Sequence, residues 1–212
     1  MSCSKKYIIL CIIILLMTAL NICLIYKIKV EKMYYNNTIR DVTTKNILSN
    51  LYKINLDVNL INNGIALDSL LLIKNVFNKE ERKIIDAFQG TNKLLICRFS
   101  ELNCQECTIY SILKTISHSD SIGKNNIVFW GDYESSKNLN IVKERLGIRD
   151  MNVYNLPYIN IPAERIGTPY YFVIDTTLTM SDFFIPDRSF PSLTDHYFEI
   201  IKKKYFMQSI TN

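Results

Sequence analysis

The longest apolar run of the 212-residue chain lies near its start, at Tyr7–Tyr26. It holds twenty residues and no charge, and at about 1.5 Å per residue a helix of this length spans roughly 30 Å, one hydrocarbon core. Tyr7 and Tyr26 stand at its two ends, where interfacial aromatic residues are common. The pattern therefore predicts a short N-terminus at residues 1–6 and a transmembrane anchor at residues 7–26.

A cleaved signal peptide is the alternative for this segment. No small-x-small cleavage site follows it, and Ile22 precedes Cys23 where a lipoprotein site needs a small residue. We therefore favour an uncleaved anchor. Lysines flank both ends, so that charge by itself leaves the orientation open; they are Lys5, Lys6, Lys27, Lys29 and Lys32.

Residues 27–55 are more polar, and from Val30 to Asn55 they include no Gly or Pro. Apolar positions recur here at loosely helical spacing; they are Ile39, Val42, Ile47, Leu48, Leu51 and Ile54. The spacing indicates a stalk helix, and a flexible tether is the alternative that the pattern leaves open.

Beyond residue 55, short apolar runs alternate with amphipathic segments. The sequence Asn62-Asn63-Gly64 predicts a hairpin turn between strands at 58–61 and 65–67, because Asn and Gly tolerate positive φ. We expect further strands at 94–99, 127–130, 151–156, 170–174 and 178–185, and helices at 79–88, 105–117, 135–146 and 193–205. Strands that alternate with helices and end in a hairpin predict a mixed α/β domain at residues 56–212.

A Cys-x-x-Cys motif lies at the junction of one such strand and helix. The motif, Cys104-Gln105-Glu106-Cys107, follows the apolar strand at 94–99. A helix N-terminus offers unpaired N–H groups and the positive end of the helix dipole, and both favour the thiolate, which is the nucleophile in disulfide exchange. The two-residue spacer lets the second sulfur resolve a mixed disulfide on the first. We expect the helix after the motif to bury one apolar stripe: Ile109, Ile112, Leu113 and Ile116.

The order of strand, Cys-x-x-Cys and helix, with Thr168-Pro169 before a later strand, resembles the thioredoxin-like superfamily. The resemblance covers roughly residues 56–205 and implies an α/β thioredoxin-like fold, with a mixed central sheet covered by helices. It implies that Cys104 is the catalytic nucleophile, that Cys107 is the resolving thiol, and that the two form a reversible disulfide. It further implies that Thr168 and Pro169 bind an extended substrate, with Pro169 in the cis form and a plain trans bond as the alternative.

Within that superfamily the chain resembles the membrane-anchored bacterial branch that acts outside the cytoplasm. This resemblance implies a single-pass protein of the bacterial inner membrane, with its C-terminal domain facing the periplasm. The expected partners are protein thiol or disulfide substrates, a redox donor, and the lipid bilayer through residues 7–26. No cofactor is expected.

Two charged residues are candidates for tuning the thiolate. Glu106 lies between the cysteines, where its negative charge opposes thiolate formation. Arg98 lies six residues before Cys104 and stabilises a thiolate if it points toward the sulfurs, or else pairs with Glu101 at the surface.

Three functions are compatible with these residues. The leading one is a thiol–disulfide oxidoreductase. A thioredoxin-fold binding module without redox activity is the second, because Asn103, Gln105 and Glu106 depart from the residues usual around the motif. A thiol peroxidase is the third, and it ranks last because Ser100 precedes Cys104 by four residues without the proline that such enzymes carry.

Charge and cysteine positions exclude other classes. The net charge of +5 is spread along the chain without a basic block interleaved with aromatics, so we expect no nucleic-acid binding. Of six cysteines, only the two of the motif form a pattern, which argues against a disulfide-stapled scaffold. A structural zinc needs four ligands, and His118 and His196 lack ligand spacing, so we expect no metal site.

The last predicted helix ends in three lysines. We expect Lys202, Lys203 and Lys204 to form a solvated helix end, with contact to a membrane surface as the alternative.

Overall fold

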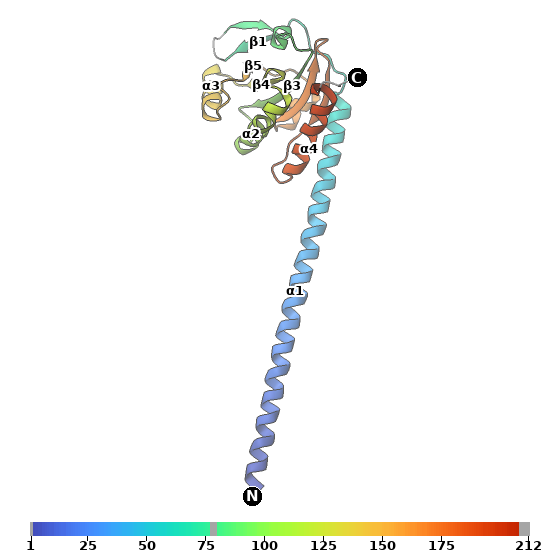
Figure 1. Cartoon of the computed structure of the whole chain (residues 1–212), viewed down its shortest axis with the longest axis vertical. Helices are drawn as coiled ribbons and strands as arrows, with labels where there is room; N and C mark the ends of the chain where they lie inside the picture. The colour runs from blue at the N-terminus through green and yellow to red at the C-terminus, as the bar shows by residue number, and fades with distance from the viewer. Residues whose placement is uncertain (1, 77–79, 208–212) are drawn as a thin grey trace. The chain divides into compact units, whose positions relative to one another are not determined.

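The computed structural model describes the backbone of residues 2–76 and 80–207, and side chains from residue 15 onward. Its backbone contacts divide the chain into two units, residues 1–51 and 52–212. Helix α1, Ser2–Asn62, forms the first unit and continues into the second. Figure 1 shows the secondary-structure elements of both units.

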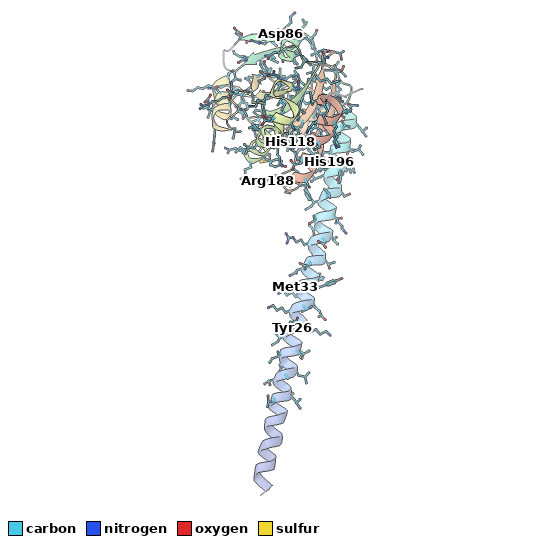
Figure 2. The ribbon with its side chains drawn as sticks, viewed as in Figure 1. Tyr26, Met33, Asp86, His118, Arg188 and His196 are labelled. Carbon is cyan, nitrogen blue, oxygen red and sulfur yellow. A yellow bond between two sulfur atoms is a disulfide. The ribbon has the colours of Figure 1, made fainter. Side chains whose placement is uncertain are left out.

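Helix α1 is continuous from Ser2 to Asn62, so residues 27–55 are helical. Apolar side chains such as Tyr26 and Met33 project from it and are exposed (Figure 2). Among the residues whose side chains are described, no helix combines the length and apolar character needed to cross a membrane. Residues 7–14 of the predicted anchor lie outside those residues.

The second unit is built on a seven-stranded sheet in the order β2-β1-β5-β4-β3-β6-β7. Strands β3, β4 and β5 are parallel to one another, whereas β6 is antiparallel to β3 and β7 is antiparallel to β6. The strands are β1 Leu72–Asn75, β2 Glu81–Lys83, β3 Lys93–Ser100, β4 Ile127–Asp132, β5 Asn152–Asn155, β6 Tyr170–Asp175 and β7 Met180–Phe184.

Three α-helices follow strands of this sheet: α2 Gln105–Ile122, α3 Ser136–Arg145 and α4 Pro191–Ile201. Short helical turns connect the rest: η1 Ile84–Phe88, η2 Lys124–Asn126, η3 Pro162–Ile166 and the π-helical η4 Lys202–Phe206. The predicted mixed α/β architecture is confirmed, as are the strands predicted at 94–99, 127–130, 151–156, 170–174 and 178–185 and the helices at 105–117 and 135–146.

The sheet separates two apolar clusters, because successive side chains of a strand point to opposite faces. Leu94 and Ile96 of β3 belong to one cluster, with residues of η1, η3 and the end of α1. Leu95 and Cys97 belong to the other, with Ile112 of α2 and residues of α3 and α4. Strand β3 is therefore buried on both faces, as its apolar sequence predicts.

The predicted hairpin at 58–67 is wrong. Helix α1 continues to Asn62, whose buried amide donates to the Val58 carbonyl at 2.7 Å and accepts from the Ala163 N–H at 3.0 Å. The chain turns at Gly64, with a φ of 85°, and then pairs with residues near β7: Met180 N–H donates to Ile65 O at 2.9 Å. Gly64 thus makes the predicted turn, but a strand far along the chain takes the place of the local partner.

The prediction of a helix at residues 79–88 is also wrong. Its described residues form strand β2 and the 3₁₀ turn η1, and residues 77–79 lie outside the described part of the chain. Strand β2 pairs with β1 in an antiparallel register, Ile73 opposite Arg82. Pairing with a neighbouring strand overrides a weak helical pattern in so short a segment.

The buried face of α2 differs from the predicted stripe. Ile112 is buried, but Leu113 is 48% exposed. Small hydroxyl residues occupy the buried face instead, since the hydroxyls of Ser111 and Thr115 donate to the carbonyls one turn earlier, at 2.8 and 2.9 Å. A hydroxyl satisfied within its own helix can be buried at little cost.

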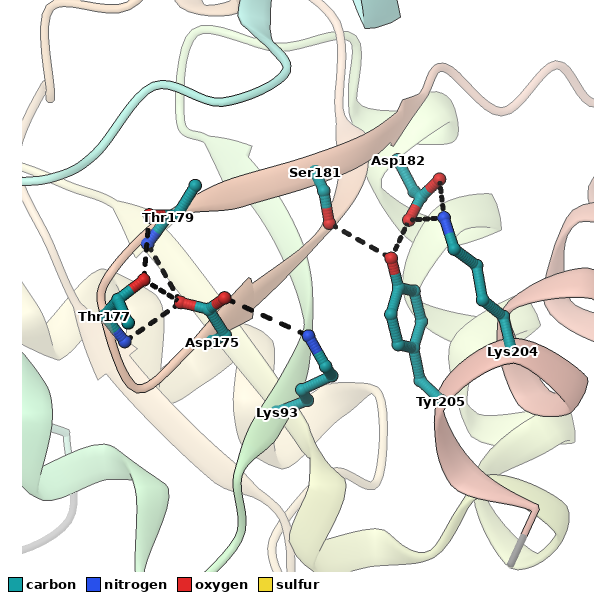
Figure 3. A network of polar contacts seen from close by, with 8 residues as sticks. All are labelled: Lys93, Asp175, Thr177, Thr179, Ser181, Asp182, Lys204 and Tyr205. Atoms are coloured by element: carbon teal, nitrogen blue, oxygen red, sulfur yellow. Dashed lines mark hydrogen bonds and ion pairs between the residues drawn. The ribbon is translucent and has the colours of Figure 1, made fainter. Parts of the chain in front are cut away.

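Among the C-terminal lysines, Lys204 is exposed, as expected, and also has an ion-pair partner. Lys204 Nζ lies 2.9 Å from both carboxylate oxygens of Asp182, which also accepts from the Tyr205 hydroxyl (Figure 3). The neighbouring turn is closed by Asp175, whose carboxylate accepts from the Thr177 N–H at 2.9 Å. The contacts of Asp182 attach η4 to β7, while the side chain of Lys204 stays half exposed to solvent.

Candidate functional site

The turn between β3 and α2 is closed by Asn103. Its side-chain oxygen accepts from the Ser100 N–H at 2.8 Å, and its own N–H donates to the Ser100 carbonyl at 3.2 Å. This turn ends β3 and starts α2 at Cys104. Asn103 departs from the residue usual before the motif, and its role in this turn was not predicted, although an Asx-type turn signal could have indicated it.

Cys104 is the N-cap residue of α2. Its sulfur accepts from the Cys107 N–H at 3.3 Å, and the Cys104 carbonyl accepts from the Thr108 N–H at 3.0 Å. An N-cap sulfur lies at the positive end of the helix dipole, which favours its thiolate when the protein is reduced.

The structure joins Cys104 and Cys107 in a disulfide, with their Cα atoms 5.2 Å apart. Cys104 is exposed and Cys107 is half-buried. The residue expected to attack a substrate is therefore the one that a substrate can reach.

Glu106 does not stand as an isolated negative charge in the spacer. Its carboxylate forms an ion pair with the guanidinium of Arg188. Arg188, labelled in Figure 2, lies in the loop before α4. Both side chains are exposed, so the pair adds little to stability. The pair does bring a positive charge to the spacer between the two cysteines. It could not be predicted from the sequence, because no local pattern links two residues 82 positions apart.

Arg98 is almost fully buried, at 1% exposure, and its guanidinium has partners other than those expected. Its Nε donates to Glu164 Oε1 at 2.7 Å and its Nη1 donates to the Leu156 carbonyl at 2.6 Å. Asp132 lies 3.6 Å away. The expected surface pairing with Glu101 is thus replaced by a buried pairing with Glu164, and no cysteine sulfur is among the guanidinium's partners in the described part of the chain.

These contacts attach β3 to the segment that leads to Thr168. Glu164 belongs to η3, which ends four residues before β6, and it also accepts from the Tyr170 hydroxyl at 3.1 Å. Burial raises the pKa of Asp132 above its ordinary value, and the nearby Arg98 charge partly opposes this. Arg98 is therefore a positioning residue between the motif strand and the Thr168 loop.

Thr168 and Pro169 lie between η3 and β6, and Pro169 is buried. No cis peptide bond occurs among the described residues, so the expected cis form of Pro169 is wrong. The chain reverses at Gly167 instead, whose left-handed φ of 72° makes the turn directly after η3. The bond before Pro169 is trans and leads straight into β6.

A cavity of about 170 Å³ brings the motif loop and the Thr168 loop together. Leu102 and Asn103 line one side of it, and Gly167 and Thr168 line another. The Thr168 hydroxyl has no hydrogen-bond partner among the described residues. Thr168 thus lies beside the loop that ends at Cys104.

Cys97 has no part in this site. It is fully buried on β3, and burial raises the pKa of its thiol to about 12, although a hydrogen bond to Thr115 opposes the shift. His118 Nε2 lies 3.0 Å from Asp195 Oδ1 and its ring stacks on Phe198, whereas His196 is exposed. Among the described residues, no group of three or more His, Cys, Asp or Glu side chains is arranged to hold a metal ion.

Comparison with known proteins identifies the fold. No protein-family model and no curated protein sequence matches the chain. A solved thiol:disulfide interchange protein from Bacteroides sp. matches with a TM-score of 0.51 at 11% identity, over 70% of this chain and 93% of its own. Peroxidoxin BcpB from Mycobacterium tuberculosis matches with a TM-score of 0.48 at 11% identity, over 68% and 97%. At such low identity the first likeness shows a thioredoxin-like fold.

Proposed function

We propose that this thioredoxin-like chain is a thiol–disulfide oxidoreductase that reduces or exchanges disulfides in proteins. The observation that carries the proposal is the exposed sulfur of Cys104 at the N-cap of α2, with Cys107 within disulfide-bonding reach. The cavity that joins the motif loop to Thr168 supports it, because an extended substrate needs backbone contacts beside the reacting sulfur. Thr168 and Pro169 are the proposed contacts.

The reaction runs in two exchange steps. The Cys104 thiolate attacks one sulfur of a substrate disulfide, forms a mixed disulfide, and releases the other substrate sulfur as a thiolate. The Cys107 thiolate then attacks the Cys104 sulfur and releases the second substrate thiolate, which leaves a Cys104–Cys107 disulfide. Two electrons have passed to the substrate, and a dithiol donor protein returns them by the same exchange in reverse.

The proposal includes the place of action. Residues 7–26 anchor the chain in the bacterial inner membrane, and the domain faces the periplasm. The uncharged run of this segment supports the anchor. Extracytoplasmic proteins are where disulfides form and persist, so a periplasmic domain would meet the proposed substrates.

The test is a redox titration of the full chain in thiol–disulfide buffers, with thiol trapping read by mass spectrometry. We expect a reversible Cys104–Cys107 disulfide. A potential near about −250 mV or lower indicates a reductant, and one near about −120 mV indicates an oxidant. If the pair does not change state across this range, the oxidoreductase proposal fails.

That outcome would favour a binding module without redox activity. The observation on its side is the set of residues around the cysteines, Asn103, Gln105 and Glu106, which depart from those usual for a redox-active motif. Such a module would keep its partner after both cysteines are replaced by serine, which a pull-down with the double variant measures.

A further inference from the structure

Asp132 is a charged residue in the lining of the cavity beside the motif loop, and the proposed reaction does not use it. It is the last residue of β4 and lies opposite Ser100 of β3 in the sheet. Its backbone carbonyl accepts from the Glu101 N–H at 3.0 Å, which fixes Asp132 beside the turn that leads to Cys104. Asn103 lines the same cavity, so the cavity begins next to the reactive cysteine.

The Asp132 carboxylate is accessible and weakly partnered. Its side chain is 30% exposed, and it accepts no hydrogen bond from the residues that the structure describes. Its ion-pair partner, Arg98 Nη2, lies 3.6 Å away, beyond hydrogen-bond distance. Arg98 is already engaged, because its Nε donates to Glu164 at 2.7 Å. Two carboxylates thus share one guanidinium in the lining of the cavity, and one negative charge there is left without a cation of its own.

Apolar side chains stand exposed in the lining of the same cavity. Leu102 is 91% exposed and Tyr158 is 50% exposed. The segment that carries Tyr158 is held in place, because the neighbouring Pro157 carbonyl accepts from Arg98 Nη2 at 3.3 Å. An occupant of the cavity can therefore cover apolar surface along its length while its far end meets a carboxylate.

The size and charge of the cavity together indicate one kind of occupant. At about 170 Å³ it is smaller than the roughly 300–1,000 Å³ of common ligand pockets, which fits one side chain better than a whole cofactor. Lysine and arginine lay an apolar stem along apolar surface while the charged head reaches a polar partner. An acidic side chain would bring a like charge to Asp132, and an apolar one would remove water from the carboxylate without replacing it.

We propose that this cavity binds a lysine or arginine side chain of the substrate protein, close in sequence to the attacked cysteine. The carboxylate of Asp132 pairs with the cationic head, and Leu102 and Tyr158 cover the stem. The preferred substrates are therefore disulfides that have a basic residue beside the cysteine. This inference rests on the proposed oxidoreductase function and adds the substrate class.

The test uses the full chain and disulfide-bonded peptides with lysine, glutamine or glutamate at one position within two residues of the cysteine. Each rate is divided by the rate with dithiothreitol, which removes the effect of the flanking charge on the peptide disulfide itself. We expect the lysine peptide to be reduced about three- to tenfold faster than the glutamine peptide, because its ammonium pairs with a partly buried carboxylate. The glutamate peptide should be the slowest. Equal rates for the lysine and glutamine peptides would overturn the proposal.

Substitutions at two carboxylates separate the cavity from a general effect of charge. D132N removes the negative charge at nearly constant shape, so the lysine-to-glutamine ratio should fall to about one. A change in the reactivity of Cys104 cancels in this ratio, because both peptides react with the same variant. E134Q is the control, since Glu134 is an exposed carboxylate two residues further along that does not line the cavity, and it should keep the ratio. A ratio that survives in D132N, or that falls equally in E134Q, would overturn the proposal.

Binding of unreactive peptides to the unchanged chain keeps the two proposals distinguishable. In these peptides serine replaces the cysteine, and their affinity for the oxidised full chain is measured by calorimetry. A lysine preference in binding without any disulfide reduction would refute the oxidoreductase function and retain the basic-residue site. Reduction without any preference, in rate or in affinity, would retain the function and refute the site.

Discussion

Arg98 of β3 and Glu164 of η3 form a buried ion pair, with Nε donating to Oε1 at 2.7 Å and side-chain exposures of 1% and 7%. The two residues are 66 positions apart in the sequence. The pair joins the strand that leads to Cys104 to the segment that leads to Thr168. It therefore sets the relative position of the two loops that line the cavity beside the motif.

Removing one partner of this pair should destabilise the folded chain more than removing both. In R98M the Glu164 carboxylate stays buried without its cation, and we expect the free energy of unfolding to fall by about 3–5 kcal/mol. In the R98M/E164M double variant the uncompensated charge is gone, so the loss should be smaller than in R98M. Urea denaturation followed by the fluorescence of Trp130, the chain's one tryptophan, measures both. If the losses in the two single variants simply add in the double variant, the pair is not coupled.

Substitution of the two cysteines of the motif should impair disulfide reduction in different ways. C104S removes the attacking sulfur, and we expect reduction of insulin disulfides by the full chain to drop at least about a hundredfold, since Cys107 is less exposed than Cys104 and does not hold the N-cap position. C107S removes the resolving thiol and should accumulate mixed disulfides between Cys104 and substrate. Mass spectrometry under non-reducing conditions detects these adducts.

The matched control for this pair is C23S, which changes an exposed cysteine of α1 outside the motif. It should reduce insulin at the rate of the unchanged chain. Full activity in C104S would show that the motif is not the site.

The Glu106–Arg188 pair should set how fast Cys104 reacts. R188A leaves the Glu106 carboxylate unpaired next to the cysteines, which disfavours the thiolate, so alkylation of the reduced chain at neutral pH should slow by about two- to fivefold. E106Q removes the negative charge and should speed alkylation by a similar factor. Stopped-flow alkylation with iodoacetamide, an uncharged reagent, measures the rates. The effect should shrink at high salt, because both side chains are exposed, and a salt-independent effect would point to a changed fold instead.

Asp195 should make stability sensitive to acid. A hydrogen bond from Lys114, at 2.6 Å, and the contact with His118 lower the pKa of the Asp195 carboxyl below its ordinary value. A carboxyl group whose pKa is lower in the folded chain than in the unfolded chain stabilises the folded chain at pH values above its unfolded pKa. This stabilisation is lost as the pH falls to the pKa of the folded chain. The free energy of unfolding should therefore fall less steeply in D195N than in the unchanged chain as the pH is lowered below about 4.

Urea denaturation at a series of pH values measures this slope. D120N is the control, because Asp120 is an exposed carboxylate on the same α2 helix and has no ion pair within the described residues. Its slope should match that of the unchanged chain. Identical slopes in D195N and D120N would contradict the role given to Asp195.

Much of the fold near the motif could be predicted from local sequence. The apolar run at 94–99 became β3, the helix after the motif became α2, and Cys104 became its N-cap. Those features depend on residues within a few positions of one another: continuous apolar side chains, a polar turn, and a helical repeat. The prediction of the buried face of α2 was partly wrong, because hydroxyl side chains that hydrogen-bond within the helix are buried in place of the expected Leu113.

From residue 94 onward, local sequence patterns thus predicted the order of strands and helices, together with a Cys-x-x-Cys pair at a strand–helix junction. What only the tertiary structure decided is which distant groups meet there. Arg98 pairs with Glu164, Glu106 pairs with Arg188, and residues 65–67 pair beside β7 rather than in a local hairpin. Charge pairing and strand pairing depend on distance in space, and a local pattern carries no information about which of many distant partners the folded chain brings within reach.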